Sequence, residues 1–141
     1  MRPDKDKYYL LIAVAVSKRS TCLRRQYGAV IVKNDEIIAT GYNGAPRGED
    51  NCCDIGECKR MNAPHNSGDY SDCHSVHAEQ NAIISAARRD MIGATLYLVG
   101  FEDDRIISEA EPCPICMRMI HNAGIARIVT HGYGRIKAVE L

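Results

Sequence analysis

The sequence predicts an α/β fold in which a mixed β-sheet carries helices on its faces. Three observations predict it: an apolar segment of helical length near the N-terminus, two β-branched segments around a short polar turn, and a later alternation of helix and strand. The 141 residues suffice for one domain with a single core. We therefore expect one domain over residues 1–141.

The N-terminal half is expected to supply one helix and one hairpin. Residues 7–17 are apolar with polar flanks, which suits a helix of about three turns. GAVIVK (28–33) and IIATGYN (37–43) flank Asn-Asp-Glu, a pattern typical of a β-hairpin. Residues 44–74 then show little periodicity, and a cysteine-rich insertion occupies about 49–74. A loop of this length inside a domain is usually functional or cross-linked.

The C-terminal half alternates helices and strands. The segment HAEQNAIISAARRD is Ala-rich with apolar residues at helical spacing, and a later helix opens with proline and is ended by Gly124. The predicted elements are, in chain order, a helix over 77–90, a strand over 94–100, an exposed connection over 101–111, a helix over 112–123, a strand over 126–132 and an edge strand over 135–141.

Composition excludes several classes of protein. The 18 basic and 18 acidic residues balance, which argues against a polynucleotide-binding surface. No apolar run reaches membrane-spanning length. Asp4 and Asp6 precede the N-terminal apolar segment and no cleavage pattern follows it, so we expect a cytoplasmic protein without a signal peptide. Seven cysteines in such a chain indicate metal binding or catalysis rather than disulfides.

Two separate segments predict one metal site. Cys113 and Cys116 share a face at the start of a helix, where the helix dipole and free N–H groups stabilise the thiolates that bind metal. The spacing alone favours a metal pair over a redox pair. With His77 as a third ligand, the fourth position of a tetrahedral zinc stays open for water, as in catalytic sites.

Glu79 is the predicted proton carrier of this site. Residues i and i+2 do not share a helix face, so His77 and Glu79 serve one site only at a helix start, with Ser75 as the expected cap. A glutamate of pKa about 4.3 cannot deprotonate bulk water, whose pKa is about 15.7. Zinc lowers the pKa of bound water to about 7, which leaves a gap of roughly 3 units that the carboxylate can bridge.

These residues reproduce a known signature. H-x-E…P-C-x-x-C, typical of zinc-dependent nucleobase deaminases, is present as His77-Ala78-Glu79 and Pro112-Cys113-Pro114-Ile115-Cys116. RRQYGAVIVKNDEIIATGYNGAPRG (24–48), HAEQNAI (77–83), EPCPIC (111–116) and IHNAGIARIV (120–129) closely resemble the deoxycytidylate (dCMP) deaminase family. The resemblance runs from about residue 8 to 131, and the family usually has Val where this chain has Tyr27.

The resemblance implies a fold and a reaction. It implies a three-layer α/β/α sandwich of the cytidine deaminase type and hydrolytic deamination of dCMP to dUMP and ammonia. A zinc-bound hydroxide would attack ring carbon 4. Glu79 would take the water's proton, deliver it to ring nitrogen 3, and later protonate the departing ammonia. Asn43 is the main substrate-binding candidate, with a turn residue as its alternative. Arg25 is a phosphate candidate, and Tyr133 follows a strand end near the expected site.

The other five cysteines suggest a second zinc. Some members of the family carry a structural zinc near the long loop, and Cys22 and a loop cysteine match that pattern. The candidate ligands are four of five cysteines: Cys22, Cys52, Cys53, Cys58 and Cys73. The choice between Cys52 and Cys53 stays open, as does replacement of one thiolate by His65. The alternative is a set of free or buried thiols.

The resemblance also implies a homo-oligomer, commonly a hexamer, and in some relatives regulation by dCTP and dTTP.

Three other functions remain open. A tRNA adenosine deaminase shares the zinc motif, but zero net charge and the GYNGAPRG segment count against it. A deaminase of a different small pyrimidine or pterin-like molecule is the second. A non-catalytic, zinc-stapled binding module is the third, and Glu79 opposes it because a structural zinc needs no uncoordinated base.

Overall fold

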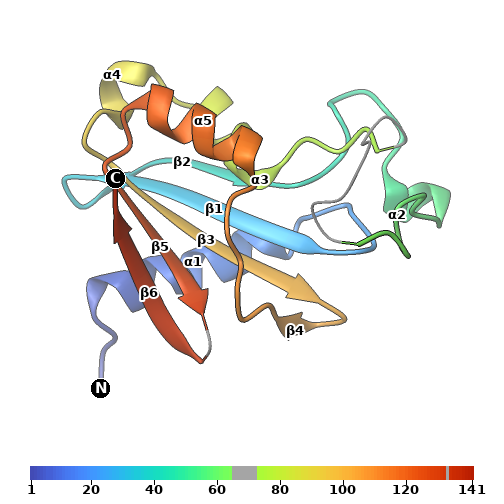
Figure 1. The fold of residues 1–141 in the computed structure, drawn as a ribbon, viewed down its shortest axis with the longest axis horizontal. Coiled ribbons are helices and arrows are strands. Elements are labelled where there is room, and N and C mark those ends of the chain that lie inside the picture. Colours follow the sequence, from blue (N-terminus) through green and yellow to red (C-terminus); the bar gives the residue numbers. More distant parts are fainter. Residues whose placement is uncertain (65–72, 133) are drawn as a thin grey trace.

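A mixed sheet forms the middle of the molecule (Figure 1). The structure is a computed structural model that describes residues 1–64, 73–132 and 134–141. The strand order is β2-β1-β3-β5-β6, and β4 pairs with the end of β3. The strands are β1 (Gln26–Lys33), β2 (Glu36–Tyr42), β3 (Thr95–Glu102), β4 (Arg105–Ile106), β5 (Arg127–Gly132) and β6 (Arg135–Glu140). β3 and β5 are parallel and the other pairs are antiparallel, so the predicted mixed sheet and the final edge strand are confirmed.

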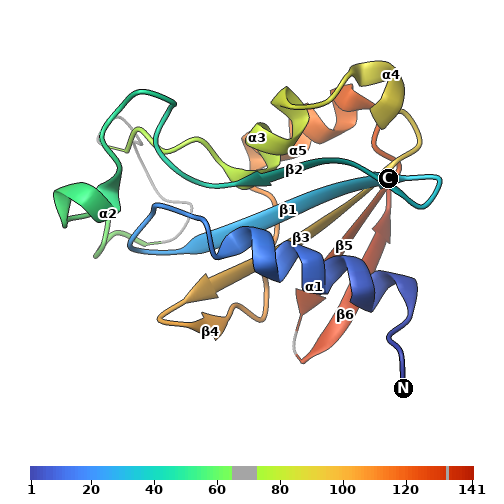
Figure 2. The ribbon, with the colours of Figure 1, turned by 180° about the vertical axis from the view of Figure 1, so that it is seen from behind.

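Helices cover both faces of the sheet, as Figures 1 and 2 show. Helix α1 (Lys5–Ser17) packs on one face. Helices α3 (Ala78–Ile84), α4 (Arg88–Met91) and α5 (Pro114–Ala123) lie on the other, and the short α2 (Cys52–Ile55) lies in the long loop. The expected three-layer α/β/α arrangement is therefore confirmed. Among the described residues, no helix combines the length and apolar character that crossing a bilayer requires.

The strands bury alternate side chains on opposite faces, which divides the core in two. Both halves exclude water almost completely, so each helical layer is held by apolar burial. The half beneath α1 contains Val30, Val32, Tyr97, Val99 and Val129 from the sheet. The half beneath α3 and α5 contains Ala29, Ile31, Leu96, Leu98 and Ile128.

Two glycines allow helices to approach the strands closely. A Cβ at Gly28 of β1 would lie 2.1 Å from the Ala13 carbonyl oxygen of α1. A Cβ at Gly41 of β2 would lie 2.3 Å from the Ala78 carbonyl oxygen of α3. These are clashes with backbone atoms, so a side chain at either position would push a helix away from the sheet. Gly41 consequently fixes the depth of α3, whose N-cap is His77 and whose first turn carries Glu79.

Two hairpin turns among the described residues, each of two residues, use asparagine or aspartate with positive φ. Asn34 and Asp35, with φ of 52° and 62°, join β1 to β2 as the sequence predicts. Asp103 and Asp104, with φ of 51° and 60°, make the same kind of turn between β3 and β4. The connection over 101–111 is mostly exposed, as expected, but its first part also continues β3 and forms β4, which the sequence did not predict. Such turns match the twist of the strands they join.

The predicted helix over 77–90 is interrupted. α3 ends at Ile84, Ser85 has φ −83° and ψ 1°, and Ala87 is extended before α4 begins. The Ala-rich composition favours a continuous helix, but the chain must turn here to enter β3. The side-chain amide of Asn81 donates to the Tyr42 carbonyl oxygen at 2.8 Å, which ties the short helix to β2.

A polar triad fastens α1 to the sheet. Asp6 accepts two hydrogen bonds from the Arg127 guanidinium, at 3.0 and 2.7 Å, and a third from the Tyr97 hydroxyl at 2.8 Å. These contacts, led by the hydrogen bonds from Arg127, lower the pKa of Asp6 below its usual range, although partial burial opposes the shift. The carboxylate is therefore better stabilised in the folded than in the unfolded chain.

Asp6→Asn is expected to lower the free energy of unfolding at pH 7 by about 1 kcal/mol, a value reduced by the partial exposure of the pair. The folded pKa lies below the unfolded one, so this stability is fully present above about pH 4 and is lost as pH falls through the folded pKa. Urea unfolding of both proteins between pH 7 and 2.5 measures it. A difference that persists unchanged at the lowest pH would contradict the ionic origin.

Candidate active site

Three side chains from two helix starts converge. His77 Nδ1 lies 3.6 Å from the Cys113 sulfur and 3.3 Å from the Cys116 sulfur. The three ligand atoms all lie within 4.8 Å of one another. Within the described ranges, this is the single group of three or more His, Cys, Asp or Glu side chains gathered so closely. The structure thus brings together the residues that the sequence predicts as the metal site.

Helix capping places these ligands. His77 is the N-cap of α3, and its backbone N–H donates to Gln80 Oε1 at 2.8 Å. Cys113 is the N-cap of α5, where its sulfur accepts the Cys116 N–H at 3.4 Å. The expectation that Ser75 caps α3 is wrong. The Ser75 hydroxyl instead lies 3.1 Å from the Cys22 sulfur.

The donor set fits zinc by its chemistry and its spacing. Zinc–sulfur and zinc–nitrogen bonds of about 2.3 and 2.0–2.1 Å at a tetrahedral angle separate sulfur from nitrogen by about 3.6 Å. The two observed separations, 3.6 and 3.3 Å, agree with this value. Burial raises the pKa of the Cys116 thiol and lowers that of His77. A bound cation favours the thiolate and the neutral imidazole, which are the ligating forms.

Glu79 lies beside this group and is nearly inaccessible, with 5% of its surface exposed. It occupies the first turn of α3 and lines the same pocket as His77 and Cys113. Burial raises the pKa of its carboxyl above the ordinary value. The Glu79 carboxyl and the Cys116 thiol each affect the pKa of the other, so the carboxyl is adjacent to the ligand atoms.

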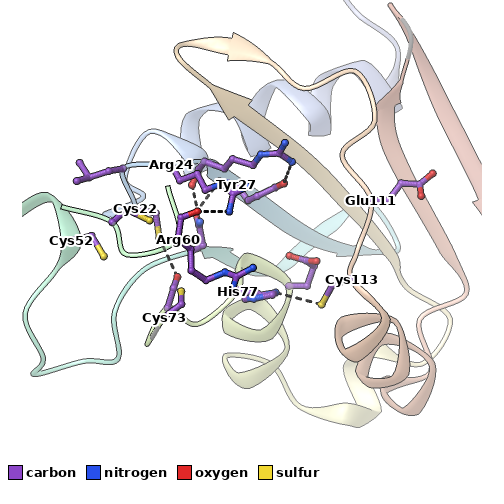
Figure 3. A pocket seen from close by; sticks show the side chains of 15 residues that line it. Cys22, Arg24, Tyr27, Cys52, Arg60, Cys73, His77, Glu111 and Cys113 are labelled. Atoms are coloured by element: carbon purple, nitrogen blue, oxygen red, sulfur yellow. Dashed lines mark hydrogen bonds between the residues drawn. The ribbon is translucent and has the colours of Figure 1, made fainter. Parts of the chain in front are cut away.

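One pocket extends from this group towards the long loop (Figure 3). His77 and Cys113 lie at one end, and Cys22, Cys52 and Cys73 lie at the other. The lining also includes Arg24 and Arg25 from the segment before β1, Tyr27 of β1, Asn43 directly after β2 and Arg60 of the loop. The pocket therefore joins the metal-ligand group to cationic side chains within one hollow.

Asn43 lines the pocket and also shapes it. Its Oδ1 accepts the Tyr27 backbone N–H at 2.9 Å and the Ser20 hydroxyl at 2.6 Å. Its Nδ2 donates to the Arg25 carbonyl oxygen at 2.9 Å. This buried amide holds the backbone of residues 25–27 in place, and one of its two N–H hydrogens is left for another acceptor.

The cysteines outside the metal-ligand group separate into two kinds. Cys22, Cys52, Cys58 and Cys73 line the pocket, whereas Cys53 is exposed and is absent from the lining. Burial raises the pKa of Cys22 to about 11, and the neighbouring Cys52 and Cys73 contribute to the rise. Burial also raises the pKa of Cys52, and Cys58, Cys73 and the adjacent Cys53 contribute to that rise. These four thiols therefore lie near one another.

Six residues of the pocket lining were not predicted as site residues, namely Leu23, Arg24, Tyr27, Arg60, Ser75 and Glu111. Arg24 donates to the backbone carbonyls of Arg60 and Ala63, which anchors the loop against the segment before β1. Arg60 extends from that loop towards His77 (Figure 3). The sequence did offer a reason to consider Tyr27, because the family that it resembles usually has valine at that position. The predicted Tyr133 and the alternative ligand His65 lie outside the described residues.

Comparison with known proteins gives consistent matches. The family model described as the cytidine and deoxycytidylate deaminase zinc-binding region matches residues 3–132. A deoxycytidylate deaminase of Mycobacterium phage D29 is 42% identical, over 91% of this chain and 94% of its own length. One from Schizosaccharomyces pombe is 38% identical, and this chain spans 38% of its length. The structure of dCMP deaminase from cyanophage S-TIM5 in complex with dCMP and dUMP is 30% identical, with a TM-score of 0.66 over 94% of this chain and 85% of that chain.

Proposed function

The chain belongs to the cytidine and deoxycytidylate deaminase family, and on that premise we propose that it deaminates dCMP to dUMP and ammonia by hydrolysis. The observation that carries the proposal is the convergence of His77, Cys113 and Cys116 beside the buried Glu79. The relative from Mycobacterium phage D29, which matches this chain over nearly the whole length of both proteins, is named for that activity. A zinc-dependent hydrolase is the class of enzyme that this site suits.

His77, Cys113 and Cys116 would hold the zinc ion. Bound there, zinc supplies a Lewis acid that makes water nucleophilic at neutral pH. Three protein ligands leave a coordination position for water or substrate, as catalytic sites require. Each ligand sits at or next to a helix N-terminus, whose dipole stabilises the anionic thiolates.

Glu79 moves protons between water and substrate. Its carboxylate would take one proton from the attacking water and deliver it to ring nitrogen 3 of cytosine. It would then take the second proton from the hydroxyl added at ring carbon 4 and pass it to the amino group, which leaves as ammonia while the C4 carbonyl forms. The burial of Glu79 beside Cys116 supports this role, because it keeps the carboxylate close to the proposed metal ligands and away from bulk water. No other carboxylate among the described residues is both buried and part of the pocket lining.

Arg25 and Asn43 bind the remainder of the nucleotide. Arg25 lines the pocket with a guanidinium suited to a phosphate. Asn43 offers its free N–H to the sugar or base while its other polar contacts fix residues 25–27. We retain Tyr133 as a prediction from the sequence.

A second zinc staples the long loop. Cys22, Cys52, Cys58 and Cys73 are its proposed ligands, and the exposure of Cys53 favours Cys52 over it. The four sulfurs are less closely gathered than the ligand atoms of the first group, and metal binding is expected to draw them together.

Two further expectations from the resemblance stay predictions. They are a homo-oligomer, with the hexamer as the form common in the family, and regulation by dCTP or dTTP.

A substrate panel tests the function. The purified protein is incubated with dCMP, deoxycytidine, cytidine and tRNA while ammonia release is followed. We expect turnover of dCMP with kcat/KM well above that of the nucleosides, and loss of turnover after zinc is removed by a chelator. Turnover of tRNA adenosine without turnover of dCMP would contradict the proposed substrate.

A further inference from the structure

Arg25 is held between two partners that lie on different sides of it. Its Nη1 donates to the Tyr27 hydroxyl at 3.3 Å, and its Nε donates to Glu102 Oε1 at 3.4 Å. Tyr27 lines the substrate pocket, whereas Glu102 lines a neighbouring surface hollow with Asp103 and Arg105. The guanidinium is therefore shared between a phenol of the pocket and a carboxylate of the neighbouring hollow.

The Tyr27 ring is fixed by the strand beside it. Tyr27 pairs with Gly100 across β1 and β3. A Cβ at Gly100 would lie 2.6 Å from Cε1 and 2.8 Å from Cδ1 of the ring, so the ring rests on the bare backbone of this glycine. The side chain of Ile107, the residue after β4, lies beside the same position on Gly100. Contact with this backbone fixes the ring, and the ring in turn fixes the position of the hydroxyl. A smaller side chain at position 27 would not reach the same position.

We propose that Tyr27 is a specificity-determining positioning residue, whose hydroxyl holds the Arg25 guanidinium in the pocket to bind the 5′-phosphate of the nucleotide. The inference rests on the proposed function. The backbone of both residues is also fixed, because the Asn43 side chain hydrogen-bonds the Arg25 carbonyl oxygen and the Tyr27 backbone N–H. A valine at position 27, which the resemblance gives as usual in the family, would have no hydroxyl to offer.

The test uses two substitutions of opposite expected sign. Tyr27→Phe keeps the ring on Gly100 and removes one hydrogen bond to a charged group, so the ratio of kcat/KM for dCMP over deoxycytidine should fall about three- to tenfold, mainly through KM. Competitive inhibition by inorganic phosphate should weaken by the same factor. Glu102→Gln releases the guanidinium towards the pocket, and both quantities should change in the opposite direction.

Controls separate this inference from folding and from the proposed function. Tyr8→Phe removes a hydroxyl from an exposed tyrosine of α1 and should leave the selectivity ratio as in the wild type. Gly100→Ala displaces the ring and should reproduce the loss seen with Tyr27→Phe. In an Arg25→Met background, Tyr27→Phe should have no further effect on the ratio. Equal losses for dCMP and deoxycytidine, or no loss, would overturn the positioning role, whereas a wild type inactive on dCMP would overturn the function itself.

Discussion

Glu79→Gln should retain zinc and lose turnover of dCMP by about a thousandfold or more. Glutamine has nearly the same size and occupies the same place in the first turn of α3, but it cannot accept and return a proton. General acid–base groups contribute about 10²- to 10⁴-fold, and the proposed mechanism gives this carboxylate two successive transfers. Metal content measured with kcat on the same preparation tests the prediction. KM should change much less than kcat.

A matched control is Glu36→Gln, which makes the same chemical change at an exposed hairpin residue outside the pocket. It should keep both its zinc and its activity. If Glu79→Gln instead loses zinc, Glu79 supports the metal site rather than carrying protons. An active, zinc-loaded Glu79→Gln would exclude the assigned role.

The metal group could be predicted from the sequence because local rules place all three ligands. His77 and Cys113 are far apart in the chain, yet each begins a helix, and each helix start is visible as a change of residue pattern. The motif that joins them is specific in a way that neither half is alone. The structure adds the separations between sulfur and nitrogen, which depend on the packing of α3 beside α5.

Other features depended on contacts between distant segments. The turn at Asn34–Asp35 was predicted and the equivalent turn at Asp103–Asp104 was missed, because β4 is too short to show an alternating pattern. The hydrogen bonds of Asn43 to residues 25–27 exist only because the end of β2 lies beside the start of β1. No single-sequence pattern predicts which backbone a side-chain amide will bind.

Cysteine replacement in the long loop is the second change with a large expected effect. Wild-type protein should contain about two zinc ions per chain, and Cys58→Ser should contain about one. The reason is that three remaining thiols hold a structural zinc far less firmly than four. Cys53→Ser is the matched control, because Cys53 is adjacent in sequence to Cys52 but is exposed and outside the pocket.

Losing that zinc should also loosen the loop and weaken substrate binding. Cleavage by a nonspecific protease within residues 49–64 should accelerate tenfold or more in Cys58→Ser, equivalent to about 1.4 kcal/mol of local opening free energy. The KM for dCMP should rise, because the loop that Arg24 anchors forms one wall of the substrate pocket. Two zinc ions retained in Cys58→Ser would remove Cys58 from the ligand set. Loss of one zinc in Cys53→Ser would reverse the choice between Cys52 and Cys53, since exposure is what distinguishes them here.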